Sequence, residues 1–334
     1  FHNDERKLYE NNRVNDADDI ADATLRRRDR HQLNKRDYHF LDANIAHRFE
    51  TGSIRHNLLF GLNGGFERSD FERIRFGSVI SPNISVLNPE PGVGEPVAIT
   101  AGTDRITDKW NYGVYLQDSA DLTDWLSVMV GGRYDRQDVD FVEQVGGFTD
   151  SQTTESFLPQ AGIVLHPGEM ISVYASYTES FNPNSVEKRA ADGSSFDAEE
   201  GTQYEVGIKA VLFDERLNLT LAGFDIEKTN IIETNPNGDN ELLGALKSKG
   251  LEFEVQAMPT PNWQIRAGYA YADSIVSDSP KAALVGARNA FAPEHDLFLW
   301  TRYNYPETVM GGTIGASLGI NYESERFTNA DVTK

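Results

Sequence analysis

The chain has 334 residues, a net charge of −21 and no cysteine, which excludes a disulfide framework and cysteine chemistry and disfavours binding to phosphate backbones. No apolar run approaches the ~20 residues of a membrane-spanning helix, so a helical membrane protein is excluded. Phe1 opens the chain without a Met or a signal-peptide pattern, and we expect the beginning of the natural protein to lie outside this sequence.

Apolar residues alternate with polar or small residues along most of the chain, which predicts β-strands with two chemically different faces. The clearest apolar positions are Leu126, Val128, Val130, Leu251, Phe253, Val255, Ile265 and Ala267. The pattern predicts thirteen strands, of which 217–230 is the least regular and a candidate for a β-bulge. They lie at 24–34, 38–50, 55–75, 110–123, 126–143, 153–165, 171–181, 201–213, 217–230, 242–258, 263–275, 292–305 and 312–324.

Short and long connections alternate between these strands. Short ones, such as 123–125 and 166–169, contain Gly, Pro or Asp, which favour tight hairpin turns. The long connections are polar and lie at 77–108, 182–199, 234–241 and 277–290. The pattern therefore places tight turns at one end of the strands and long loops at the other.

Strand length distinguishes a membrane barrel from a soluble sandwich, because both show alternation with period 2. Several predicted strands exceed the ~5–6 residues usual in globular proteins, and ~9–11 residues span an outer membrane. The apolar faces also end in tyrosines, which resemble the aromatic girdle of a barrel: Tyr134, Tyr177, Tyr269, Tyr271, Tyr303 and Tyr322. We predict an all-β fold, an antiparallel transmembrane β-barrel whose polar face lines the lumen.

Several consecutive segments resemble the barrel of TonB-dependent outer-membrane receptors of the ferric siderophore class. They include NYGVYLQD at 111–118, GGRYD at 131–135, YASYTESF at 174–181, EGTQYEVGIK at 200–209 and SKGLEFE at 248–254. Their order along the chain is also that of the family. The resemblance implies that 1–334 is part of one barrel domain, about 13 of roughly 22 strands, with long extracellular loops and short periplasmic turns. It implies further that the family's plug domain and C-terminal strands are absent from this sequence.

The same resemblance suggests roles for residues on the polar face. Charged side chains there are expected to form a solvated wall of mixed sign that contacts the plug, with direct contact to the ligand as the alternative: Arg133, Glu205, Lys209, Glu252, Glu254, Arg266 and Arg302. Aromatic side chains of the same parity are the candidate ligand-binding residues, with packing of the lumen as their alternative role: Tyr115, Tyr174, Phe298 and Trp300. Tyr115 and Tyr174 are predicted to lie nearer the long loops and are the first choices.

No catalytic or metal-binding residue is predicted. The seven His are scattered along the chain. Residues 315–319 fit the G-x-S-x-G pattern of a nucleophile elbow, but that motif needs a following helix, and Ser317 lies within an alternating strand. We therefore expect no cofactor, and the resemblance implies that iron is held by the oxygens of a siderophore.

The resemblance implies a receptor and transporter in the outer membrane of a Gram-negative bacterium that takes up ferric siderophores by TonB-coupled active transport. It would not be an enzyme. The implied partners are the ferric siderophore, the TonB–ExbB–ExbD complex acting through the plug, and outer-membrane lipid and lipopolysaccharide, but no nucleic acid. The alternatives are a TonB-dependent importer of another nutrient, such as a glycan or cobalamin, and a non-transport outer-membrane or surface β protein.

Overall fold

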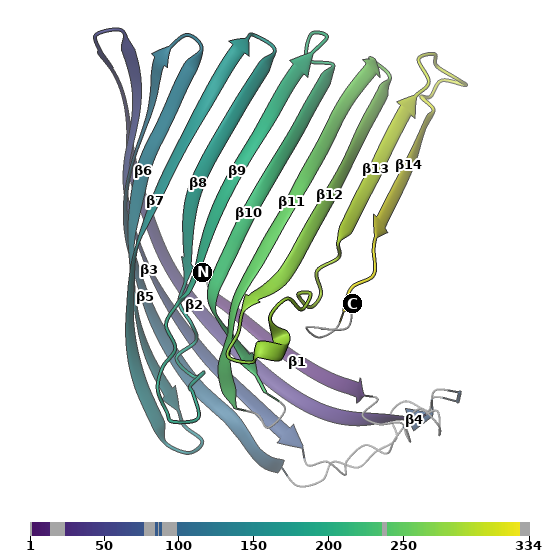
Figure 1. Cartoon of the computed structure of the whole chain (residues 1–334). Helices are drawn as coiled ribbons and strands as arrows, with labels where there is room; N and C mark the ends of the chain where they lie inside the picture. The colour runs from purple at the N-terminus through teal and green to yellow at the C-terminus, as the bar shows by residue number, and fades with distance from the viewer. Residues whose placement is uncertain are drawn as a thin grey trace. The chain divides into compact units, whose positions relative to one another are not determined.

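The computed structural model describes residues 2–13, 24–76, 84–85, 87–88, 99–235 and 239–327. Its strands are β1 (His2–Arg13), β2 (Thr24–Thr51), β3 (Ile54–Phe76), β4 (Ile84–Ser85), β5 (Ile99–Thr123), β6 (Leu126–Glu143), β7 (Phe148–Gly168), β8 (Ile171–Asn182), β9 (Glu199–Leu212), β10 (Leu217–Thr234), β11 (Asn240–Thr260), β12 (Trp263–Asp278), β13 (His295–Asn304) and β14 (Gly315–Glu323). One short 3₁₀-helix, η1 (Ala282–Leu284), lies between β12 and β13 (Figure 1).

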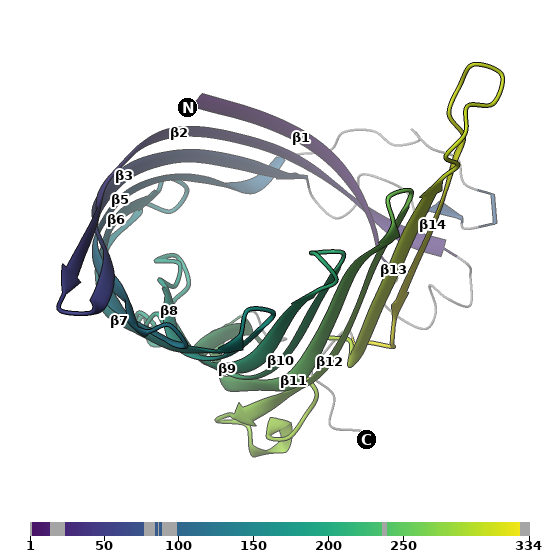
Figure 2. The same cartoon turned by 90° about the horizontal axis from the view of Figure 1, so that it is seen from above.

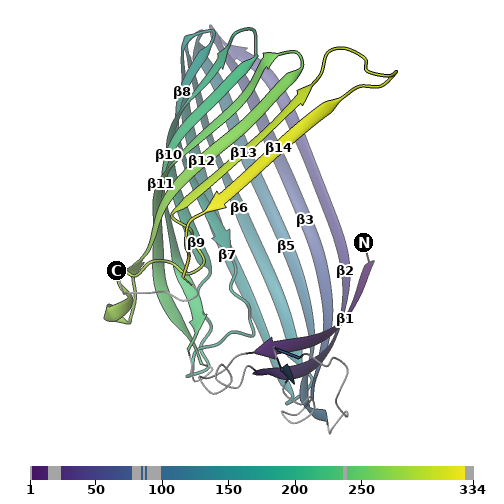
Figure 3. The ribbon, with the colours of Figure 1, turned by 90° about the vertical axis from the view of Figure 1, so that its right-hand side faces the viewer.

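The described strands form one sheet in sequence order, except that the two-residue strand β4 pairs with β2. Figure 2 shows the later strands, β9 to β14, following one another in this order. Within it β13 and β14 form an antiparallel hairpin with a continuous register from Asp296↔Glu323 to Asn304↔Gly315 (Figure 3). The prediction of an all-β, antiparallel fold is confirmed, and a sandwich of two sheets is excluded.

The chain divides into two compact units. The first consists of Phe1–Ala43, Leu62–Gly113 and Arg136–Glu155, and the second of Asn44–Gly61, Val114–Asp135 and Ser156–Lys334. In the first unit, ion pairs join neighbouring positions of the sheet, such as Arg136 to Glu155 at 2.6 Å and Arg68 to Asp108 at 3.1 Å. The second unit contains all of the predicted site residues.

The predicted strands differ from the structure at four places. The segments 24–34 and 38–50 form the single strand β2, and β1 was not predicted. Strand β5 begins at Ile99 instead of at residue 110, and β7 begins at Phe148 instead of at residue 153. Both faces of these segments are polar, as in HNDERK at 2–7, so they show no apolar period. The backbone register from His2↔Asp37 to Arg13↔Arg26 nevertheless pairs β1 with β2. The remaining residues of the predicted loop 77–108 lie largely outside the described residues.

The predicted irregularity in 217–230 is real, but it lies further along the strand. Register shifts occur between Lys228 and Ile232, whereas Leu217 to Lys228 pair with β11 without interruption. Phe224 and Ile226 therefore lie on the polar face because of regular alternation and without a bulge. Phe224 is accommodated because its neighbour across the strands is Gly250.

Direct cross-strand partners share a face of a sheet, so the register defines two faces across β8 to β13. The polar face contains Ser172, Tyr174, Ser176, Glu205, Lys209, Thr220, Glu252, Glu254, Gln256, Arg266, Phe298 and Trp300. The apolar face contains Val173, Ala175, Val206, Ile208, Leu219, Leu221, Leu251, Phe253, Val255, Ile265, Ala267, Leu297 and Leu299.

Contacts at Gly131 extend both faces to β5 and β6. A Cβ added at Gly131 would lie 3.1 Å from the Cβ of Gln117 and 3.0 Å from the Nε2 of Gln160, and Gln160 pairs with Thr178 on the polar face. Arg133 has the same parity as Gly131 and so lies on the polar face. Leu126, Val128 and Val130, the remaining predicted apolar positions, alternate with it and lie on the apolar face.

The apolar face is bounded by aromatic residues along β12. Trp263, paired with Tyr303, lies at the short-turn end, and Tyr269 and Tyr271 lie toward the long loops. One step further along the same face, the side chains become charged, with Lys249 paired to Asp273. The apolar part of β12 thus covers 263–271, which matches the ~9–11 residues that cross an outer membrane.

Val255→Arg is expected to lower the free energy of unfolding by ~2–4 kcal/mol, because it places a charge in the middle of the face expected to meet lipid. Gln256→Arg is the matched control, since the next residue lies on the polar face. Urea unfolding of the full-length protein in lipid vesicles measures both. An equal loss of stability in the two variants would contradict this assignment of the faces.

Candidate functional site

All of the predicted site residues lie on the polar face, but they fall into separate groups. A cavity of about 360 Å³ is lined by side chains that include Tyr174, Glu205, Lys209, Glu252, Glu254 and Phe298. Tyr115 and Arg133 form a separate contact between β5 and β6, with the guanidinium carbon 5.6 Å from the ring centroid. Trp300, Arg266 and Arg302 lie nearer the short turns, and Trp300 pairs with Arg266.

Tyr174 is held in place by its neighbours on β9. Its hydroxyl donates a hydrogen bond of 2.5 Å to Oε1 of Glu205, whose other oxygen accepts one of 3.0 Å from Gln203. The ammonium of Lys209 lies 5.2 Å from the centroid of the Tyr174 ring, a cation–π distance. Directly beneath the ring is Gly207, the cross-strand partner of Tyr174.

Glycine across the strand is common to the four candidate aromatic residues. A Cβ at Gly207 would lie 2.6 Å from Tyr174, and side chains at Gly61 and Gly268 would collide with Tyr115 and Phe298. A Cβ at Gly319 would lie 3.8 Å from Trp300, in ordinary contact. The rings of Tyr115, Tyr174 and Phe298 therefore lie close against the neighbouring backbone, an arrangement that supports packing of the wall as well as contact with a ligand.

Phe224 has the same arrangement and was not predicted as a site residue. A Cβ at its partner Gly250 would lie 2.5 Å from the Phe224 ring. The parity of Phe224 was visible in the sequence, but its pairing with a glycine depends on the register between β10 and β11. Asp296 is a second residue of the cavity that the sequence analysis missed.

The charged residues of the polar face are partly compensated by neighbours two positions along the same strand. Arg133 donates to Asp135 at 2.5 Å, and Arg302 donates to Asn304 at 3.0 Å. Gln256 donates to Glu254 at 3.1 Å. The cavity itself is rich in carboxylates, since Lys209 is its one cation among the described residues that line it.

The positions along the strands differ in part from the expectation. The register places Tyr174 one step nearer the long loops than Phe298 and two steps nearer than Trp300, as predicted. Tyr174 is nevertheless the fourth residue of β8, which begins at a short turn at Ile171. Its location therefore argues for a contact within the lumen and not at the mouth formed by the loops.

The described residues contain no group of three or more His, Asp or Glu side chains that is arranged to hold a metal ion. No helix among these residues has the length and apolar character of a transmembrane span.

The loops after β10 and β12 are joined by a small cluster. Lys281 lies 2.5 Å from Glu241 and 3.0 Å from Glu233, and these carboxylates raise the pKa of its ammonium above the ordinary value. Beneath them, Val276 is fully buried against Leu243, Ala287 and neighbouring apolar side chains. In the loop after β8, hydrogen bonds from Ser194 lower the pKa of Asp192.

Gly207→Ala is expected to destabilise the protein by ~1–3 kcal/mol, because the new methyl group must displace the Tyr174 ring from its contacts with Glu205 and Lys209. The loss should shrink when Tyr174→Ala is combined with it, and a double-mutant cycle of unfolding free energies measures this coupling. Gly168→Ala is the control, since nothing lies within 4 Å of the added Cβ. Additive effects of the two changes would refute the contact.

Lys281→Ala is expected to speed hydrogen exchange severalfold at the amides of Leu284 and Gly286, because the loop loses its ties to both strands. These amides donate to carbonyls of Lys281 and Val276 in the closed loop. Lys188→Ala, an exposed lysine of another loop, is the control. Exchange rates unchanged from wild type would show that the apolar cluster alone holds the loop.

A family model described as TonB dependent receptor-like, beta-barrel matches residues 2–334. The metal-pseudopaline receptor CntO of Pseudomonas aeruginosa is 30% identical over 322 residues, which cover 91% of this chain and 43% of that protein. The ferrichrome outer membrane transporter/phage receptor of Escherichia coli is 30% identical over 285 residues, covering 82% and 37%. The chain thus spans about two fifths of the length of these curated relatives.

Among solved structures, BauA, the ferric preacinetobactin receptor from Acinetobacter baumannii, superposes with a TM-score of 0.83 over 99% of this chain and 50% of that one. The sequence identity is 18%, so this likeness shows the fold alone. The all-β fold of the described residues agrees with the family model. The chain belongs to the β-barrel family of TonB-dependent receptors, which are transport receptors in the outer membrane of Gram-negative bacteria.

Proposed function

We propose that the protein takes up ferric siderophores across the outer membrane by TonB-coupled active transport. The observation that carries this proposal is the family match over residues 2–334, together with relatives named for ferrichrome, ferripyoverdine and ferrioxamine B. In this proposal the chain forms part of the barrel, and a plug domain and the remaining strands complete it. The TonB–ExbB–ExbD complex acts on that plug and not on the wall described above.

In the proposed transport, the polar face is the wall of the path. Its aromatic rings offer flat apolar surfaces to the rims of a bulky chelate at little cost in conformational entropy, because glycines already hold them in place. The predicted plug-facing side chains around the cavity contact the plug; they are Glu205, Lys209, Glu252 and Glu254. Arg133, Arg266 and Arg302 contribute charge of the opposite sign elsewhere on the same face.

The proposal assigns no cofactor and no reaction to the protein. Iron travels as the complete chelate and is held by the siderophore's own oxygens, so its coordination does not require protein ligands. The polar face then needs to recognise only the outside of the chelate. No bond of the ligand is made or broken in the barrel, and the protein is a transporter and not an enzyme.

A second candidate is an importer of a chelate of another metal. The observation that favours it is the name of one relative, a metal-pseudopaline receptor that covers 91% of this chain at 30% identity. Both candidates share the same path and the same energy source. They differ in the metal and in the outside of the chelate.

In the full-length receptor, the double change Tyr115→Ala and Tyr174→Ala is expected to weaken binding of the cognate ferric siderophore about tenfold. Aromatic contacts of this kind contribute ~0.5–1.5 kcal/mol each beyond the area buried, and 1.4 kcal/mol corresponds to a factor of ten. Binding of radiolabelled iron chelates to whole cells, at matched receptor levels, measures the change.

Tyr305→Ala is the control for this experiment, since Tyr305 is an exposed tyrosine just after β13 at the short-turn end. Unchanged affinity in the double variant would leave Tyr115 and Tyr174 with packing of the wall as their only role. A receptor that binds no ferric siderophore but does bind another metal chelate would replace the first candidate with the second.

A further inference from the structure

Two rows of side chains on the polar face, across β8 to β12 on the side of the long loops, form a surface with little charge. Each row consists of direct cross-strand partners, and the first row lies one step nearer the loops than Tyr174. We call the two rows the loop-side wall. The first contains Ser176, Glu205, Phe224, Gly250 and Ala272, and the second contains Thr178, Gln203, Ile226, Ser248 and Ser274.

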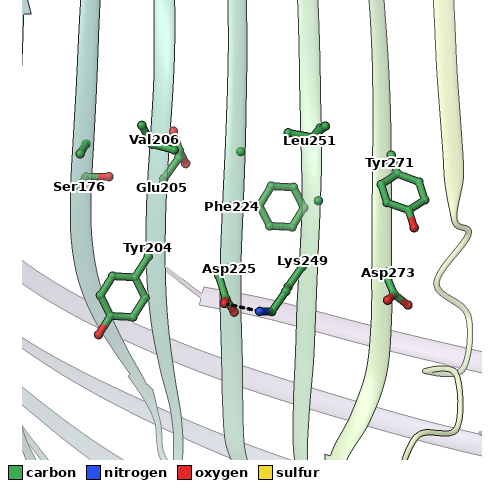
Figure 4. A pocket seen from close by; sticks show the side chains of 13 residues that line it. Ser176, Tyr204, Glu205, Val206, Phe224, Asp225, Lys249, Leu251, Tyr271 and Asp273 are labelled. Atoms are coloured by element: carbon green, nitrogen blue, oxygen red, sulfur yellow. Dashed lines mark ion pairs between the residues drawn. The ribbon is translucent and has the colours of Figure 1, made fainter.

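Phe224 lies at the centre of the loop-side wall. Its ring packs against the backbone of its partner Gly250, where an added Cβ would be 2.5 Å away, and Figure 4 shows the ring between the ribbons of β10 and β11. Ile226 is the next residue of β10 on the same face, and both side chains are half-buried. Together they offer a ligand an apolar surface that lies nearer the loops than Tyr174 does.

The polar groups of the loop-side wall are almost all neutral. Glu205 is its one charged residue, and the two carboxylate oxygens already accept hydrogen bonds from Tyr174 at 2.5 Å and from Gln203 at 3.0 Å. Thr178 and Ser248 add hydroxyls, which can donate to the outer oxygens of a chelate without contributing charge. The wall is therefore suited to a ligand that presents apolar groups and uncharged oxygens.

Cations at the loop end of the same strands are held by carboxylates. Lys228 lies 2.6 Å from Glu199, Arg288 lies 2.7 Å from Glu294, and Lys281 contacts two carboxylates. An anionic ligand could recruit these cations only by breaking an existing ion pair. On the opposite side of the loop-side wall lies the cavity around Tyr174, in which carboxylates predominate. The surroundings thus disfavour negative charge.

We propose that the loop-side wall contacts the chelate and selects one without net negative charge, such as iron(III) held by three hydroxamate groups. Each hydroxamate carries one negative charge, so three of them neutralise the iron. Each catecholate carries two, so the corresponding tris-catecholate complex is an anion. In a lumen from which the ligand displaces water, that anion is repelled by the nearby carboxylates and finds no free cation on the wall. The inference rests on the proposed function and deepens it, because it names the chemical class of the siderophore.

The test compares two iron(III) complexes built on one tripodal scaffold, a tris-hydroxamate and a tris-catecholate, by titration calorimetry with the purified full-length receptor. Wild type is expected to bind the hydroxamate complex about tenfold more tightly. Phe224→Ala should weaken binding of that complex about tenfold, because the apolar surface is lost. Ser248→Lys adds an unpaired cation to the wall and should raise the affinity for the catecholate complex about tenfold.

Asn218→Lys is the matched control for Ser248→Lys. It also adds a cation to the polar face, but at the short-turn end of β10, where Asn218 pairs with Val211 and Gln256. The ratio of the two affinities should remain that of wild type in this variant. Circular dichroism of each variant checks that the strand content is retained.

A wild-type receptor that binds the catecholate complex at least as tightly as the hydroxamate complex would overturn the inference and leave the proposed function standing. A ratio that Ser248→Lys does not change would do the same. Uptake of radiolabelled iron by whole cells separates the two failures. If the receptor binds neither complex but imports another ferric siderophore, only the inference is wrong, whereas a receptor that imports no ferric siderophore refutes the proposed function too.

Discussion

A chain that crosses a bilayer as strands must satisfy every backbone N–H and C=O within its own sheet, because the hydrocarbon offers no partners. Strands β8 to β13 are paired on both sides, with register shifts near the ends of β10, β11 and β12, and this pairing leaves each strand only its two faces on which to differ. Side chains are therefore sorted by parity in the middle of the strands: the apolar face is free of charge from Trp263 to Tyr271 along β12, and the charged side chains of this part lie on the other face. The clusters described above all follow from which residues the register makes neighbours.

Glycine allows large side chains to pack closely against the neighbouring strand. On the polar face, Gly207 and Gly268 allow the rings of Tyr174 and Phe298 to lie across the adjacent strand. This contact shields the glycine backbone and fixes the ring, so one pair stabilises the wall and orients an aromatic surface. On the apolar face, Gly223 lies against the side chain of its partner Leu251, whose Cδ2 would be 3.3 Å from an added Cβ. Glycine thus permits close cross-strand packing on both faces.

The sequence predicts which face of the sheet each side chain occupies, because the lipid-facing and lumen-facing sides require different residues. Val255 and Arg266 each lie on the face that alternation predicts. Alternation failed where both faces are polar, as in β1 and the first part of β5, since no apolar period marks those strands. The glycine–aromatic pairs could not be predicted either, because they depend on the alignment of neighbouring strands. Pairing Gly207 with Tyr174 requires the register of β8 with β9, which no local pattern specifies.

Three consecutive residues of β9 show how closely the two faces constrain each other. Glu205 accepts the hydrogen bond of Tyr174 on the polar face, while Tyr204 and Val206 lie on the apolar face. A slip of one residue would carry Glu205 into the lipid and bring Val206 to the cavity, so both faces oppose it at once. Two costs therefore oppose a slip: the charge of Glu205 would be desolvated in lipid, and the hydrogen bond from Tyr174 to Glu205 would be lost. For this reason a single layer of strands can form a polar cavity on one face and an apolar surface on the other, with no core between them.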